Sequence, residues 1–79
     1  MRVIIGGEPY EGSPVEIVTE LKERAWFEGD IDEYMVWVAR NVWRLTGKGM
    51  KIKRKDEGTV EERCVNFLRE LGKITGGCM

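Results

Sequence analysis

Apolar residues recur every three to four positions in three stretches of the chain, which is the spacing of a half-buried helix. We expect helices over residues 14–27, 31–45 and 60–71. Each stretch follows a residue that favours a helix N-terminus and has a Glu three positions later: Ser13, Asp30 and Thr59. Gly29 and Gly47 follow the first two stretches and predict where those helices end.

The middle helix has an apolar arc that covers more than half of its circumference. The arc contains Ile31, Tyr34, Met35, Val36, Val38, Ala39, Val42, Trp43 and Leu45. So wide an arc predicts a central helix that packs against more than one neighbour. We therefore expect Trp43 to be a core residue. In the third helix, Cys64 lies within a narrow apolar face, which predicts a buried thiol.

The N-terminal residues have the pattern of a β-hairpin. Residues 2–5 are rich in β-branched side chains, and the Gly6-Gly7 pair after them favours a tight turn because glycine accepts positive φ. Residues 8–11 form the return arm. Pro9 cannot donate a backbone hydrogen bond, so this arm is expected to be short or to lie at a sheet edge.

A third short strand is predicted between the last two helices, where Met50 and Ile52 alternate with lysines over residues 50–54. Its pairing with the hairpin stays open at this point. The predicted order of elements is ββααβα, in one compact α+β domain over residues 1–75. Residues 76–79, Gly-Gly-Cys-Met, are expected to form a flexible tail.

Composition narrows the classes of function. The 79 residues suffice for one domain with a modest core, and 42% apolar with 34% charged residues is typical of a folded helical protein. The chain contains no His, which excludes Ser–His–Asp and Cys–His catalysis and every His-bearing metal site. No segment has the pattern of a membrane span or a signal peptide.

We expect neither an enzyme nor a cofactor or metal site. The acidic clusters coincide with helix starts, where capping explains them, and Gly6-Gly7 lacks the Lys and Ser or Thr of a phosphate-binding loop. Cys64 and Cys78 form no CxxC pair, and Cys78 is expected to be exposed. A disulfide between them stays open, but two free thiols in a reducing cytoplasm are the simpler interpretation.

Positive charge is concentrated in the middle of the chain. Residues 34–55 contain seven basic and no acidic residues, whereas residues 1–33 contain nine acidic and three basic ones. The basic patch after the second helix consists of Lys48, Lys51, Lys53, Arg54 and Lys55. Such a patch binds a polyanion such as nucleic acid, or it protects a sheet edge from aggregation. We favour edge protection.

The sharpest candidate site is a stripe on the polar side of the middle helix. It consists of Trp37, Arg40, Asn41 and Arg44, which share one face at i, i+3, i+4 and i+7. A Trp in this position is expected to be covered by its own chain, by stacked arginines or by a partner, and Trp and Arg are enriched at interface hot spots. The arginines would pair with acids of the first helix, within one chain or between two: Glu16, Glu20 and Glu23.

Residues 2–45 resemble the ribbon-helix-helix repressors in their order of strand, helix, tight turn and helix. The resemblance implies a protein whose strand reads DNA bases in the major groove. Two features differ from that pattern. Alternate strand positions Arg2, Ile4 and Gly6 offer one polar side chain, and the basic charge lies after residue 39. No site residue is therefore transferred from that family.

The sequence thus predicts a small, non-enzymatic interaction or regulatory module in the cytoplasm. We expect it to act as a homodimer, with another protein as a further partner and without a membrane. The alternative is a nucleic-acid-binding regulator, which would either loosely resemble the ribbon-helix-helix repressors or use the basic residues between positions 40 and 55.

Overall fold

The chain begins with the expected antiparallel hairpin, formed by β1 (Arg2–Ile5) and β2 (Glu8–Glu11). The structure is a computed structural model and describes residues 1–75. The turn residues Gly6 and Gly7 both have positive φ, a conformation that costs glycine little. In the strand register Val3 lies opposite Tyr10, and both side chains are buried.

Three helices follow the hairpin: α1 (Pro14–Arg24), α2 (Ile31–Thr46) and α3 (Val60–Thr75). Each begins at the predicted position with a reciprocal pair of hydrogen bonds. The capping side chain accepts the backbone N–H of the Glu three residues later, and that Glu accepts the backbone N–H of the capping residue. α2 ends at Gly47 in the left-handed conformation, also as predicted.

The predicted ends of the other two helices are wrong. α1 stops at its C-cap, Ala25, because Trp26 adopts a left-handed backbone with φ of +56°. The amide of Phe27 then donates to the carbonyl of Lys22, which closes a Schellman turn. Gly29 therefore does not end the helix. α3 continues past residue 71 to Thr75.

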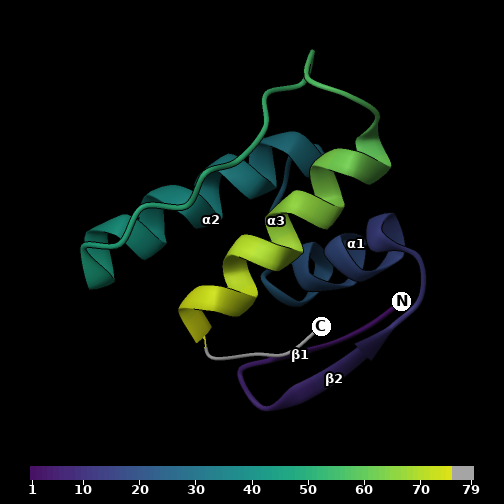
Figure 1. The fold of residues 1–79 in the computed structure, drawn as a ribbon, viewed down its shortest axis with the longest axis horizontal. Helices are drawn as coiled ribbons and strands as arrows, with labels where there is room; N and C mark the ends of the chain where they lie inside the picture. Colours follow the sequence, from purple (N-terminus) through teal and green to yellow (C-terminus); the bar gives the residue numbers. More distant parts are fainter. Residues whose placement is uncertain (76–79) are drawn as a thin grey trace.

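The core lies between the hairpin and the three helices. α3 packs against α1 and β1, and α2 packs against α1 (Figure 1). Tyr34 of α2 meets Phe67 of α3, with ring centroids 6.1 Å apart. The buried apolar residues are Val3, Tyr10, Ile17, Val18, Tyr34, Met35, Cys64, Phe67, Leu68 and Leu71. The buried position of Cys64 confirms the prediction for that residue.

The predicted third strand is not present among the described residues. Residues 48–55, which we call the return segment, run back alongside α2, while the hairpin lies on the opposite side of the domain (Figure 1). Its backbone is bonded by side chains of α3: the N–H of Lys51 donates to Glu70 (3.2 Å), and its carbonyl accepts from Asn66 (2.7 Å). Met50 and Ile52 pack against the core, which explains their alternation with lysines.

The observed order is therefore two strands followed by three helices, in a small compact α+β domain. Within residues 1–75, no helix combines the length and the hydrophobicity needed to cross a membrane. The predicted flexible tail, residues 76–79, and with it Cys78, lies outside the described residues.

Candidate interaction surface on helix α2

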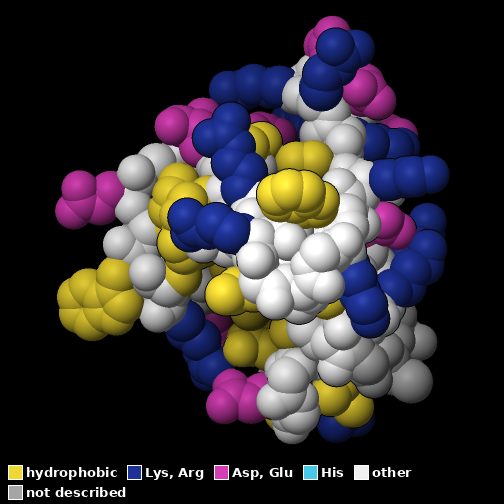
Figure 2. All heavy atoms as spheres, turned by 90° about the vertical axis from the view of Figure 1, so that its left-hand side faces the viewer, with side chains coloured by type: hydrophobic (Ala, Val, Ile, Leu, Met, Phe, Trp, Pro, Cys, Tyr) yellow, Lys and Arg dark blue, Asp and Glu magenta, His cyan; other side chains and the backbone are white. Residues whose placement is uncertain are grey.

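Helix α2 is buried along one side only. Tyr34 and Met35 enter the core, whereas the opposite side of the helix is open to solvent. We call that open side the α2 surface; it is formed by Glu33, Val36, Trp37, Arg40, Asn41, Trp43 and Arg44. Figure 2 faces the C-terminal end of α2 and shows hydrophobic side chains between Lys and Arg side chains, with most acidic side chains toward the periphery.

The predicted stripe is present on this surface, and its members contact one another. The amide of Asn41 donates to the backbone carbonyl of Trp37 (2.7 Å), and its side-chain oxygen accepts from Arg44 (3.2 Å). The Trp37 ring packs beside Phe27 at a centroid distance of 5.3 Å, yet 43% of the residue stays exposed. Its own chain therefore covers Trp37 only in part.

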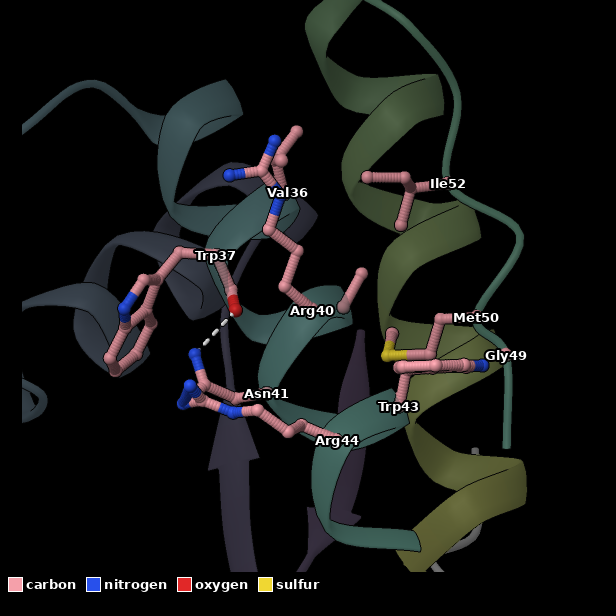
Figure 3. Close-up of a pocket in the computed structure, with 10 residues that line it drawn as sticks. Val36, Trp37, Arg40, Asn41, Trp43, Arg44, Gly49, Met50 and Ile52 are labelled. Carbon is pink, nitrogen blue, oxygen red and sulfur yellow. Dashed lines mark hydrogen bonds between the residues drawn. The ribbon is translucent and has the colours of Figure 1, made fainter. Parts of the chain in front are cut away.

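A hollow of about 690 Å³ lies over this part of α2, between the helix and the return segment. Arg40 runs along its middle, with Trp37 on one side and Trp43 on the other (Figure 3). Met50 and Ile52 of the return segment form the far wall. The hollow thus combines apolar walls with two arginines, and no acidic residue lines it.

Trp43 is the main correction to the predicted core. It is 64% exposed, and Val36 and Leu45 of the same predicted arc are 40% and 84% exposed. The last turn of α2 extends beyond the rest of the domain (Figure 1), so apolar residues there have no core to enter. Trp43 lies instead beside Met50, at the open hollow (Figure 3).

The two arginines of the α2 surface have no acidic partner within the described part of the chain. No carboxylate of residues 1–75 lies within 4.0 Å of Arg40 or Arg44. Of the two alternatives for these arginines, pairing with α1 within one chain is therefore wrong. Glu16 of α1 accepts the N–H of Ser13, and Glu20 pairs with Arg24 (3.5 Å).

The predicted basic patch divides into two groups. Arg54 pairs with Glu57 (3.0 Å), and Lys55 pairs with Asp30 (3.3 Å). The hydrogen bond from Arg54 lowers the pKa of Glu57 below its ordinary value. Among residues 1–75 the side-chain ammonium groups of the remaining three lysines of the patch have no carboxylate within 4.0 Å: Lys48, Lys51 and Lys53. Since residues 50–54 form no strand, edge protection does not explain the patch.

A second hollow, of about 490 Å³, lies toward the N-terminal end of α2. It shares Val36, Trp37 and Arg40 with the first hollow, but acidic residues also line it, among them Glu33. Three basic residues of the return segment line it too: Lys53, Arg54 and Lys55. Among the residues of the α2 surface itself, Glu33 lies near the start of the helix, and Arg40 and Arg44 lie toward its end.

Reactive groups are not found on this surface. The one cysteine among the described residues, Cys64, is enclosed in the core, and its burial raises the pKa of the thiol to about 11. Within residues 1–75 no three His, Cys, Asp or Glu side chains are grouped to hold a metal ion.

Sequence reasoning missed four residues of this region. The capping pattern accounts for Glu33 as part of a helix cap, but Glu33 also precedes Trp37 by one helical turn and so shares its side. Val36 was assigned to the core, and Met50 and Ile52 to a strand.

The chain matches no protein-family model, and no curated protein or solved structure is significantly similar to it.

Proposed function

We propose that this protein is a small non-enzymatic interaction module that binds a second copy of itself through the α2 surface. The observation that carries the proposal is the exposure of two tryptophans and two arginines on one helix face. Exposed aromatic residues beside Arg are typical of interface hot spots, and partial burial by a partner removes apolar surface from water. A cytoplasmic location fits with this role, because the buried Cys64 is a free thiol.

Self-association is tested by sedimentation velocity across a concentration series, with Trp43→Ala as the test variant. We expect the substitution to raise the dimer dissociation constant by at least about tenfold, as loss of a hot-spot side chain does. Trp26→Ala is the matched control, because Trp26 is 90% exposed and lies outside the α2 surface. It should leave the dissociation constant unchanged. A wild-type chain that stays monomeric at about 200 μM, where even weak dimers are populated, contradicts the proposal.

One observation favours nucleic-acid binding as a second candidate function. Lys48, Lys51 and Lys53 are exposed, and within residues 1–75 their ammonium groups have no carboxylate within 4.0 Å. They lie close in sequence to Trp43, and a cationic groove with aromatic side chains binds single-stranded nucleic acid by stacking. The test is fluorescence anisotropy of a labelled oligonucleotide at two salt concentrations.

Binding through the lysines requires a steep loss of affinity with salt, because bound counterions are released. Replacing Lys48, Lys51 and Lys53 together by Gln would then abolish binding to the oligonucleotide and to heparin. If the oligonucleotide does not bind at about 50 mM salt, where electrostatic contacts are strong, this second candidate is wrong.

A further inference from the structure

Four residues of the α2 surface form a single line along the helix at i, i+4, i+7 and i+11: Glu33, Trp37, Arg40 and Arg44. This is the spacing of the seam between two helices in a coiled coil. At 1.5 Å per residue the line is about 16 Å long, which is most of the length of α2. Trp37, Arg40 and Glu33 are all exposed, so a second helix can approach the whole line.

The line has opposite charges at its two ends. Glu33 at the first end accepts the backbone N–H of Asp30 at 3.3 Å, which leaves its second carboxylate oxygen free of that bond. No cation of residues 1–75 lies within 4.0 Å of Glu33. Arg40 and Arg44 at the other end equally have no carboxylate partner within the described residues. These unsatisfied charges are complementary to each other, but they are separated by three turns of one rigid helix.

We propose that two copies of the chain pair their α2 helices antiparallel about a twofold axis, an inference that rests on the self-association proposed above. In this dimer Glu33 of each copy binds the partner's Arg44, and Arg40 of each copy stacks on the partner's Trp37. A single register achieves both contacts, because positions 33 and 44 have the same midpoint along the helix as positions 37 and 40, and the twofold axis passes through that point. Each contact therefore occurs twice.

Other arrangements of the same surface satisfy fewer charges. A parallel pair would place Glu33 against the partner's Glu33 and Arg44 against the partner's Arg44, which is repulsive. The acidic side of α1 is a poorer match for the arginines, because Glu20 already pairs with Arg24.

The apolar part of the surface fits the same dimer. On the helix wheel Val36 and Trp43 lie together on one flank of the line. A twofold axis perpendicular to both helices brings this flank of the two copies to the same side of the pair. The second copy would then border the hollow beside Arg40. It would also shield the guanidinium of Arg40 from water, and a cation–π contact with an aromatic ring is stronger when the cation is shielded from water than when it is exposed.

The test is a charge exchange measured by sedimentation equilibrium of the full chain. Arg44→Glu and Glu33→Arg should each raise the dimer dissociation constant by at least about tenfold, since each places like charges together. The double variant E33R/R44E restores opposite charges in the same register. It should therefore bind within about threefold of the wild type, a strong departure from additivity.

Two control variants separate the interface from folding. Glu62 has the same capping position in α3 that Glu33 has in α2, so Glu62→Arg removes the equivalent capping bond. Arg69→Glu reverses the charge of an exposed arginine of α3. Neither should change dimerisation, and circular dichroism should show helix content near the wild-type value in every variant. If the chain dimerises but the double variant is no tighter than the weaker single variant, the antiparallel register is wrong while self-association stands. A monomeric wild type overturns both.

Discussion

The guanidinium of Arg63 binds the carboxylate of Asp32 through two hydrogen bonds, of 2.8 Å from Nε to Oδ1 and 3.2 Å from Nη2 to Oδ2. The pair joins the first turns of α3 and α2, and both side chains are largely buried. Arg63 also donates to the carbonyl of Gly58 at 2.8 Å. These bonds fix the direction of α2, and therefore of the α2 surface, relative to the core.

Breaking this ion pair should destabilise the fold. Arg63→Ala is expected to lower the free energy of unfolding by about 3 kcal/mol, because it leaves a largely buried carboxylate without its partner. Arg63→Lys should recover only part of the loss, since an ammonium cannot form the same two bonds. Urea unfolding followed by circular dichroism measures both. If Asp32→Ala/Arg63→Ala together cost as much as the sum of the single substitutions, the two residues are not coupled.

Trp43→Ala is expected to change the stability of the monomer by less than about 1 kcal/mol, because the side chain is mostly in water. Phe67→Ala, by contrast, should cost about 3–5 kcal/mol, since it removes a ring from the centre of the core. Phe67 is 0% and Trp43 64% exposed. The comparison should be made below the concentration at which dimers form. Equal losses for the two variants would place Trp43 in the core after all.

Trp26→Gly should stabilise the protein by about 0.5–1 kcal/mol, because glycine adopts the left-handed conformation without the penalty of a Cβ atom. The substitution removes almost no packing, since Trp26 is 90% exposed. The thermal midpoint reports the gain. Trp26→Ala is the comparison, because it removes the same ring and keeps the Cβ atom, and it should give no such gain.

Stability should fall in acid. The backbone N–H of Glu33 and the side chain of Lys55 lower the pKa of Asp30, and the backbone N–H of Lys51 and the side chain of Lys73 lower the pKa of Glu70. A carboxyl group whose pKa is lower in the folded state than in the unfolded state stabilises the fold when the pH is above its unfolded pKa. That stabilisation is lost as the pH falls through the pKa of the folded state. The thermal midpoint should therefore decrease from about pH 5 to pH 3.

Asp30→Asn/Glu70→Gln keeps an acceptor oxygen at both positions and should flatten this decrease. Glu61→Gln serves as the control, because Glu61 is an exposed carboxylate of α3, and it should leave the slope as in the wild type. An unchanged slope in the double variant would show that other carboxylates cause the acid sensitivity.

Cys64 should not react with a thiol reagent in the native protein. It is fully enclosed, and the reactive thiolate is rare because the pKa of the thiol is raised to about 11. A Cys78→Ser chain isolates the response of Cys64. Labelling at neutral pH should proceed only at the rate of unfolding, and prompt labelling of the folded chain would mean that the core is open at this position.

The helix starts could be predicted from the sequence because a capping box is a local device. Ser13, Asp30 and Thr59 each meet their Glu within one turn, whatever the rest of the chain does. The end of α1 could not, because Trp26 adopts a conformation that its residue type disfavours. The preceding turn and the following Phe27 hold it there.

The candidate site was predicted in part for a similar reason. The wheel of α2 correctly grouped Trp37 with Arg40, since that relationship depends on the helix alone. It could not show that the core ends before Trp43, because this depends on how far the neighbouring helices extend. The alternation at Met50 and Ile52 was real, but an extended segment that packs on helices produces it as well as a strand does.

All three tryptophans of the protein are more than two-fifths exposed in the folded chain. Their fluorescence emission should thus resemble that of indole in water already in the native state, with only a small shift when the chain unfolds. Emission is therefore a poor probe of the core. It is instead a direct optical signal for the α2 surface, because covering Trp37 and Trp43 would move the emission to shorter wavelength and protect it from a soluble quencher such as acrylamide.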